Sequence, residues 1–204
     1  GQRNKLNVLV NRYDGVNLPD NDCRILIVDS LPICDNLSDR YEMECREGSE
    51  VTILKQVQKI EQGLGRSVRG EKDYSVIIII GSDLVNFMMN HRTASYFSPQ
   101  TRKQIEIANE LVESLRQEIL DSTDSRKNLL DLIGQSLKRD SNWKAYYQQE
   151  MDSMSETEDN HHVYAIMEKE REYECAAYNR NYEKACTIVS EVINMCAGNP
   201  QEQA

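Results

Sequence analysis

The sequence lacks any apolar run long enough to cross a membrane. Its longest continuous apolar stretch is Val76–Ile80, far short of the roughly 20 residues that a transmembrane helix needs. The N-terminal residues GQRNK are polar, and the apolar segment of a secretory signal does not follow them. We therefore expect a cytoplasmic protein that makes no contact with a membrane.

Patterns typical of metal sites are also missing. The six cysteines never form a C-x-x-C pair, whereas zinc and iron–sulfur sites need closer cysteine pairs or neighbouring histidines. His161 and His162 are adjacent, but such a pair is more typical of a solvated helix start than of a ligand set. The sequence predicts no metal site, and its thiols are those of a reduced, cytosolic protein.

Two nucleotide-binding motifs are absent from these 204 residues. There is no G-x-x-x-x-G-K-[ST] phosphate loop and no D-E-x-H magnesium-binding motif, so this chain alone is not expected to bind and hydrolyse ATP. The net charge of −10 is unevenly spread. Residues 1–97 carry 12 Lys/Arg and 14 Asp/Glu, and residues 98–204 carry 12 and 20. The acidic second half suits nucleic-acid phosphates poorly, so any such contact is expected in the first half.

The first half has the pattern of alternating strands and helices. We predict strands at 6–10, 24–32 and 74–82, a polar, acidic stretch to about Gly48, and a helix at 49–64 with apolar residues at helical spacing. This alternation predicts an α/β fold with a parallel sheet, and the β-branched run after Tyr74 indicates a strand covered on both faces. A sheet of only three strands would leave an apolar edge unpaired. Either another domain covers that edge or the chain is a piece of a larger protein, and we favour the second interpretation.

The second half is predicted to be all-α. Ser98-Pro99 is a strong helix start, because serine caps and proline suits the first helical position. That helix should reach about Leu120, followed by helices at 125–139, 141–153 and about 160–196, the last with a possible break near 179–181. An aromatic group on the third of these helices, Trp143, Tyr146 and Tyr147, suits either base stacking or packing, and packing is favoured.

One motif connects the helix at 49–64 with the strand at 74–82. It is Q-x-x-G-R-x-x-R, at residues 62–69, and the segment VLVNRYDGVNLPDNDCRILIVDSLP precedes it at 8–32. Together they resemble motifs VI and V of the second RecA-like motor domain of superfamily 2 DEAD/DEAH-type helicases, in the branch that contains the bacterial DinG and the XPD helicases. The resemblance covers about residues 6–97. It implies two domains: residues 1–97 as part of a RecA-like parallel sheet with helices, and residues 98–204 as a helical C-terminal domain.

The resemblance also implies roles for particular residues. Arg66 and Arg69 would be arginine fingers, which neutralise charge on a transferring phosphoryl group, and Gln62 would lie beside the phosphate or the attacking water. The implied ATP-binding residues are Asp14, Gly15, Asn17 and Gly65, and the implied nucleic-acid-binding residues are Asn11 and Arg12. Asn17 departs from the aspartate usual at its position, although an amide can still bind a ribose hydroxyl.

The implied substrates and partners follow from these roles. ATP and Mg²⁺ would be held mainly by a first motor domain that is absent from this chain. Nucleic acid would be the second partner, with DNA favoured over RNA, and a link to a phage-defence system would add a partner protein. The chain would then be the C-terminal fragment of an ATP-dependent helicase or translocase.

Other interpretations of the same residues remain open. The motif arginines suit two surface charges, Asp14 and Asn17 suit turn formers, and Arg12 suits a plain surface charge. A non-catalytic interaction module is the main alternative, in which a degenerate motor fold has lost ATP hydrolysis and the acidic helices bind a partner protein. A regulatory nucleotide-binding domain is a third alternative, weakened by the missing phosphate loop.

Overall fold

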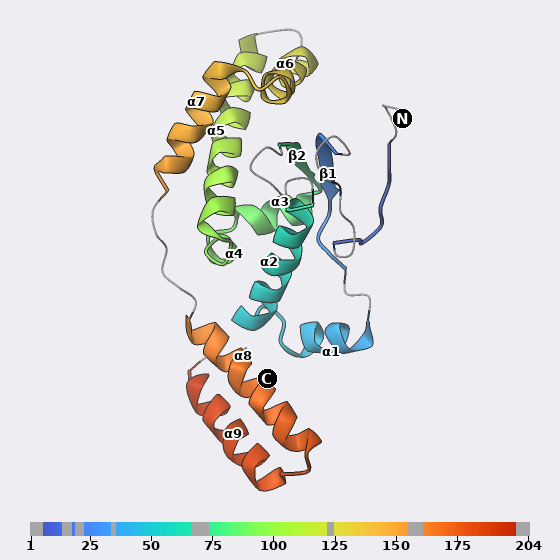
Figure 1. Cartoon of the computed structure of the whole chain (residues 1–204), viewed down its shortest axis with the longest axis vertical. Coiled ribbons are helices and arrows are strands. Elements are labelled where there is room, and N and C mark those ends of the chain that lie inside the picture. The colour runs from blue at the N-terminus through green and yellow to red at the C-terminus, as the bar shows by residue number, and fades with distance from the viewer. Residues whose placement is uncertain are drawn as a thin grey trace. The chain divides into compact units, whose positions relative to one another are not determined.

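The computed structural model describes residues 6–13, 18, 23–33, 36–66, 74–121, 125–154 and 161–198. The described strands are β1 (Ile25–Asp29) and β2 (Val76–Ile80), drawn as arrows in Figure 1. The described helices are α1 (Leu37–Cys45), α2 (Glu50–Leu64), α3 (Ser82–Met89), α4 (His91–Ala94), α5 (Pro99–Asp121), α6 (Ser125–Leu137), α7 (Ser141–Asp152), α8 (His161–Tyr178) and α9 (Tyr182–Met195). This part of the chain is therefore mostly helical, with a small parallel sheet.

The sheet consists of two of the three predicted strands. β1 and β2 are parallel, in a register that pairs Ile25 with Val76 and Asp29 with Ile80. Val28 is buried at 8% exposure, whereas the exposure of Ile27 is 54%. Because successive side chains of a strand point to opposite faces, one face of β1 is packed and its other face is uncovered.

The predicted strand at 6–10 is wrong. Residues 6–10 have no regular secondary structure, and the side chains of Leu6, Val8 and Val10 are 77–85% exposed. A strand forms only where its backbone N–H and C=O groups pair with a neighbouring strand. Apolar, β-branched residues favour a strand but cannot supply that neighbour, and the described residues provide none beside this segment.

Helix α2 confirms the predicted helix at 49–64, and its apolar residues Val51, Leu54, Val57 and Ile60 are buried. Three described helices, α1, α3 and α4, were not predicted. α1 lies in the polar stretch and has no buried residue, so apolar spacing could not indicate it. α3 begins where the predicted strand was still continuing, because Gly81 has a φ of +89° and ends the extended backbone.

The described helices of the second half agree with their predicted positions. The predicted break near 179–181 is confirmed, since α8 ends at Tyr178 and α9 begins at Tyr182. Nε2 of Gln104 on α5 donates a 2.8 Å hydrogen bond to the hydroxyl oxygen of Tyr147 on α7, and the Tyr147 ring stacks on Trp143 with the ring centroids 6.3 Å apart. These contacts favour packing as the role of the α7 aromatics.

The chain divides into two compact units. Unit 1 contains residues 1–33 and 57–156, and unit 2 contains residues 34–56 and 157–204. In unit 2, small and branched residues hold α8 against α9, with Ala176, Ala185 and Ile188 buried. The predicted domain boundary at residue 98 stays a prediction. Among the described helices, none is long and apolar enough to cross a membrane.

Candidate functional site

The turn that follows α2 carries the described part of the Q-x-x-G-R-x-x-R motif. α2 ends at Leu64, and the chain then turns as Gly65 N donates to Glu61 O at 2.9 Å and Arg66 N donates to Gly63 O at 3.2 Å. The side chain of Gln62 is exposed, Gly65 is exposed, and Arg66 is half-buried. Gln62, in the last turn of α2, and Gly65, just after the helix, are therefore both on the surface of the described part of the chain.

Arg66 joins this turn to the segment that contains the predicted motif V. Its guanidinium donates through Nε to the carbonyl oxygen of Tyr13 at 2.9 Å, and Nη2 donates to the same oxygen. The carbonyl oxygen of Arg66 accepts a hydrogen bond from Leu18 N at 3.3 Å. Two segments that are 53 residues apart in the sequence thus meet at one residue.

Several predicted site residues lie outside the described residues. These are Asp14, Gly15, Asn17 and Arg69. The residues on either side of the loop at 14–17, Tyr13 and Leu18, are described and both bind Arg66. Both residues that flank positions 14–17 therefore lie at the turn after α2.

Tyr13 packs directly against the last turns of α2. A Cβ atom at Gly63 would lie 2.5 Å from Cδ1 of the Tyr13 ring, so the absence of a side chain at Gly63 makes room for the ring. The Tyr13 hydroxyl donates to the carbonyl oxygen of Ser30 at 3.2 Å. Burial raises the pKa of this hydroxyl above its ordinary value of 10.0, and the carboxylates of Asp29 and Asp83 raise it further. The hydroxyl therefore stays protonated and can donate the hydrogen bond to Ser30 O.

Asn11 and Arg12, the two predicted nucleic-acid contacts, differ in what they bind. The Asn11 side chain bridges the backbone of Ile33: Nδ2 donates to Ile33 O at 3.0 Å, and Oδ1 accepts from Ile33 N at 3.2 Å. Asn11 has a φ of +50°, a conformation that asparagine tolerates better than most residues. Lys59 of α2 also donates to Ile33 O, at 3.0 Å. Arg12 is exposed, and among the described residues its side chain makes no hydrogen bond or ion pair.

The carboxyl ends of β1 and β2 lead into the segment after β1, to which Tyr13 binds, and into the start of α3. Leu31 N donates to Oδ2 of Asp83 at 2.9 Å, which ties the segment after β1 to the first turn of α3. Hydrogen bonds from the backbone N–H groups of Leu31 and Leu84 lower the pKa of the Asp83 carboxyl below its ordinary value of 3.8. Gly81 completes the junction, because a Cβ there would lie 2.9 Å from Ser30 N.

Sequence reasoning missed three residues of this region. Tyr13, Gly63 and Asp83 were not predicted as parts of the site. A glycine inside a helix, as at Gly63, costs about 1 kcal/mol relative to alanine and indicates a packing reason. An acidic residue in the first turn after a strand, as at Asp83, is a common helix-start signal. Nothing in the sequence pairs either residue with its partner.

The segment that contains Tyr13 and Leu18 and the turn after α2 therefore meet at Arg66. Residues 7–104 match the family model of the helicase C-terminal domain. Comparisons with curated proteins and with solved structures found no match. The matched segment, residues 7–104, contains the Arg66–Tyr13 contact and both described strands.

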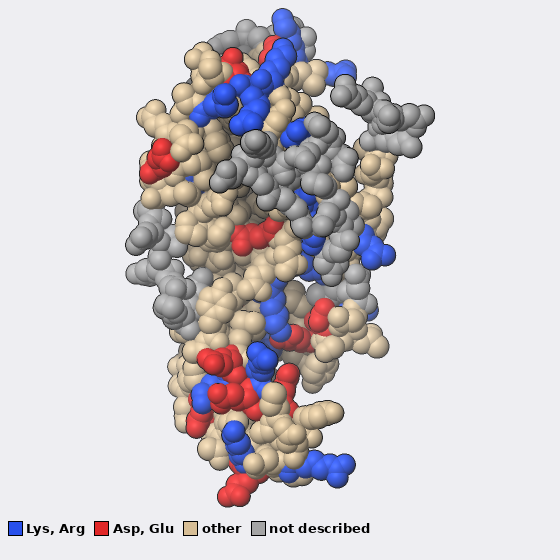
Figure 2. All heavy atoms as spheres, in the orientation of Figure 1, with Lys and Arg blue, Asp and Glu red and all other residues tan. Residues whose placement is uncertain are grey.

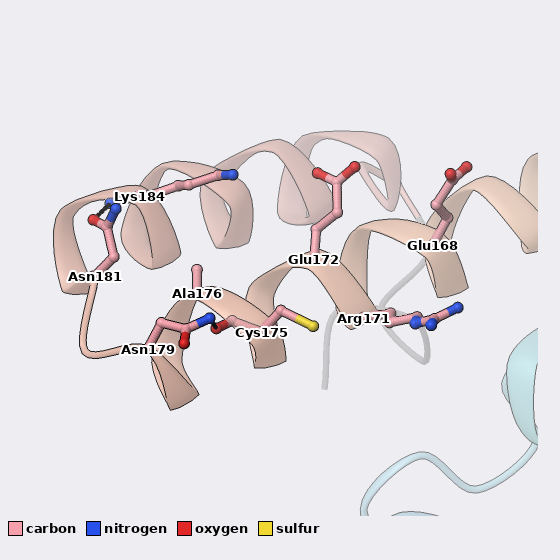
Figure 3. A pocket seen from close by; sticks show the side chains of 8 residues that line it. All are labelled: Glu168, Arg171, Glu172, Cys175, Ala176, Asn179, Asn181 and Lys184. Carbon is pink, nitrogen blue, oxygen red and sulfur yellow. Dashed lines mark hydrogen bonds between the residues drawn. The ribbon is translucent and has the colours of Figure 1, made fainter.

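A concave surface lies on unit 2, outside the matched segment at residues 7–104. It is a groove of about 390 Å³ on the α8–α9 hairpin, lined by Glu168, Arg171, Glu172, Cys175, Ala176, Asn179, Asn181 and Lys184. Figure 3 shows these side chains spread along the hairpin without converging on one point. Figure 2 shows acidic and basic side chains intermixed over this hairpin, so no single charge favours an anion or a cation. In the described parts of the chain, no group of three or more His, Cys, Asp or Glu side chains suits a metal ion.

Proposed function

We propose that this chain is the C-terminal part of an ATP-dependent nucleic-acid helicase or translocase, supplying half of the ATP site and part of the nucleic-acid track. One observation carries the proposal. Within a segment that matches the helicase C-terminal domain, the turn with the Q-x-x-G-R-x-x-R motif binds both residues that flank the loop at 14–17. A motor needs these two elements together, because nucleotide chemistry at one must be coupled to nucleic-acid contact at the other.

The nucleotide half of the proposal concerns the turn after α2. Phosphoryl transfer to water spreads negative charge over the γ-phosphate, and an arginine held there accelerates it by roughly 10³–10⁵. We assign this charge to Arg69. Gln62 is exposed and would orient the attacking water, and Gly65 has no side chain to obstruct close approach of a phosphate. ATP with its Mg²⁺ would be held mainly by a first motor domain, since the chain contains no phosphate loop.

The nucleic-acid half of the proposal concerns residues 11–17. Asp14, Gly15 and Asn17 would contact the ribose of the nucleotide or the nucleic-acid backbone. Arg12 is exposed and available to a phosphate, whereas the Asn11 amide is held by Ile33 and would shape the loop that presents Arg12. Arginine suits this contact because its planar donors match phosphate oxygens.

The finer classification and the partners belong to the same proposal. The order of the two motifs supports a superfamily 2 enzyme of the DinG/XPD branch with a RecA-like second motor domain. Its partners would be a nucleic acid, with DNA favoured, the N-terminal motor domain and, in a defence system, a partner protein. Because ATP and nucleic acid occur inside the cell, a cytoplasmic location follows from the proposal.

The decisive experiment measures ATP hydrolysis by the full-length protein with and without single-stranded DNA or RNA. We expect nucleic acid to stimulate hydrolysis, and Arg69→Ala to lower kcat by roughly 10³-fold. Arg116→Ala is the matched control, because the Arg116 side chain is 71% exposed and, among the described residues, forms an ion pair with Glu113 one helical turn away. Wild-type hydrolysis by the Arg69→Ala variant would show that Arg69 is not a finger.

A further inference from the structure

Two guanidinium groups contact the ring of Tyr74 at the amino ends of the two strands. Cζ of Arg24, the residue before β1, lies 4.0 Å from the ring centroid, and Cζ of Arg139 lies 4.9 Å from it. Arg24 Nη1 also donates to the carbonyl oxygen of Tyr74 at 2.8 Å. A cation over an aromatic face within about 6 Å of its centroid is attracted by the ring. One tyrosine therefore holds two positive charges, at the opposite ends of the strands from Ser30 and Leu31.

The guanidinium of Arg139 has donors that no described residue uses. Arg139 is exposed in the turn between α6 and α7, and among the described residues its side chain makes no hydrogen bond or ion pair. The cation–π contact uses the positive charge of the group and does not need its N–H donors. Because the ring already holds this side chain, binding of an anion costs less conformational entropy than it would at a mobile arginine.

Arg139 belongs to a basic stretch inside the acidic second half. Residues 125–139 contain four Lys/Arg and one acidic residue, Asp131, whereas the remainder of 98–204 contains 8 Lys/Arg and 19 Asp/Glu. All four basic side chains are exposed, and we call them the α6 basic cluster: Arg126, Lys127, Lys138 and Arg139. Helical hydrogen bonding continues to Lys138, which is about three turns from Lys127, so these two lysines lie on one face about 16 Å apart. Figure 2 shows Lys and Arg side chains gathered where Figure 1 places α6.

The length of this cluster suits an extended polyanion. Each strand of a nucleic-acid duplex carries one phosphate per about 3.4 Å of axis, so about 16 Å of basic surface meets roughly four to five phosphates. A small anion would engage only one or two of these side chains. Lysine supplies a point charge to phosphate oxygens, and arginine supplies a planar fork that can also stack on a base. Nucleic acid offers both phosphates and bases, whereas an acidic polypeptide offers carboxylates without bases, so the cluster fits nucleic acid better.

We propose that the α6 basic cluster is a second nucleic-acid contact of this chain, in which Tyr74 positions Arg139 for a phosphate. The cluster lies outside the matched segment at residues 7–104. Its attraction for a polyanion follows from its charge, whereas the choice of nucleic acid rests on the proposed function. The net negative charge of the second half does not prevent the contact, because charges farther away than about 10 Å are largely screened at about 0.1 M salt.

Fluorescence anisotropy of a labelled single-stranded oligonucleotide with the 204-residue chain tests the contact. Lys138→Gln/Arg139→Gln removes two phosphate contacts, so we expect the slope of log K against log salt concentration to fall in magnitude by roughly 1.4. The same relation predicts binding about 25-fold weaker than wild type at about 0.1 M salt and equal to it near 1 M salt.

Arg180→Gln/Lys184→Gln is the matched control. It also removes one Arg and one Lys, from exposed positions on the α8–α9 hairpin, so the two double variants have the same net charge. We expect the control to bind within about twofold of wild type, because distant charges are screened. Equal weakening in both double variants, or no binding of the oligonucleotide by the wild-type chain at low salt, would overturn the proposal.

Two substitutions at Tyr74 test how Arg139 is positioned. Tyr74→Phe keeps an aromatic face, so we expect an affinity within about twofold of wild type. Tyr74→Leu removes the ring, and we expect roughly fivefold weaker binding, the loss of one phosphate contact, with no further loss in an Arg139→Gln background. Wild-type affinity in a folded Tyr74→Leu variant would show that the ring does not position Arg139. Where Tyr74→Leu fails to fold, Arg139→Gln alone decides, and an affinity within about twofold of wild type would overturn the proposal.

Two further measurements distinguish the partner and the proposed function. Weaker binding of labelled poly-glutamate by Lys138→Gln/Arg139→Gln, with oligonucleotide binding unchanged, would assign the cluster to an acidic protein and overturn the proposal. Weaker oligonucleotide binding by that variant, when the full-length protein shows no nucleic-acid-stimulated ATP hydrolysis, would support the cluster and refute the proposed function. Wild-type oligonucleotide binding by the variant, with stimulated hydrolysis in the full-length protein, would leave the proposed function standing and overturn the cluster.

Discussion

Single residues in this site act through backbone groups as much as through side chains. Arg66 binds Tyr13 O with its guanidinium and Leu18 N with its own carbonyl, and Asn11 binds both backbone groups of Ile33. Segments without regular structure cannot satisfy their own N–H and C=O groups, so side chains must do so. Substitution of Arg66 or Asn11 is therefore expected to change the geometry of the backbone segments that these side chains bind, and not only the local charge.

Asp83 gives a pH-dependent prediction at this scale. Its folded pKa lies below 3.8 because Leu31 N and Leu84 N donate to the carboxylate. A lowered folded pKa contributes stability above the unfolded pKa, and this contribution is lost as pH falls through the folded value. We expect the free energy of unfolding to fall as pH drops below about 4, and Asp83→Asn to remove that part of the dependence.

The measurement is urea unfolding of the 204-residue chain at a series of pH values from 7 to below 4, a range set by the ordinary carboxyl pKa values. Asp131→Asn is the control, because Asp131 is an exposed residue of α6. Equal pH dependence in the Asp83→Asn variant and in wild type would mean that the carboxylate does not hold Leu31.

At the scale of elements, the N-terminus of helix α5 is capped both by a neighbouring residue and by a residue distant in the sequence. Ser98 caps α5 as the sequence predicts, and its Oγ accepts from Thr101 N at 3.3 Å. Glu61 of α2 adds a cap from a distance, because its Oε1 accepts from Ser98 N at 2.9 Å and from Ser98 Oγ at 2.7 Å. The helix that carries the motif turn is thereby tied to the start of α5.

Removing this distant cap should weaken unit 1. We expect Glu61→Ala to lower the free energy of unfolding by about 1 kcal/mol, the usual cost of a lost cap. Glu113→Ala should cost less than about 0.5 kcal/mol, since its ion pair with Arg116 is exposed. Both values come from urea unfolding at neutral pH, and equal losses would show that Glu61 does not cap α5.

At the scale of the whole chain, charge and apolar surface are both unevenly distributed. The second half carries most of the net negative charge, whereas the matched segment, residues 7–104, has nearly balanced charge. Apolar side chains are exposed at residues 6–10 and on one face of β1. A net charge of this kind repels a polyanion more strongly from the second half of the sequence than from the first.

The salt dependence of nucleic-acid binding tests whether the first half of the sequence makes a phosphate contact. If Arg12 contacts one nucleic-acid phosphate, Arg12→Ala should weaken binding and reduce the slope of log K against log salt concentration by roughly one. Lys144→Ala removes the same charge from an exposed position on α7 and should leave the slope unchanged. Fluorescence anisotropy with the full-length protein gives both slopes. Equal slopes for wild type and Arg12→Ala would show that Arg12 does not contact a nucleic-acid phosphate.

The sequence alone determined what depends on neighbouring residues. The spacing of apolar residues located α2, the Ser98-Pro99 pair located the start of α5, and the glycines of the motif at residues 62–69 indicated the turn after α2. These features follow from helical periodicity, capping and local backbone preference, all of which operate within a few residues.

Only the tertiary structure decided which distant groups meet. It gave residues 6–10 no strand partner among the described residues, placed Tyr13 on Gly63, and joined Arg66 to Tyr13 and Leu18, about 50 residues earlier. The reason is that local patterns specify what a segment can form, whereas a partner for a backbone carbonyl or a strand edge depends on how the strands align and on which helices cover them.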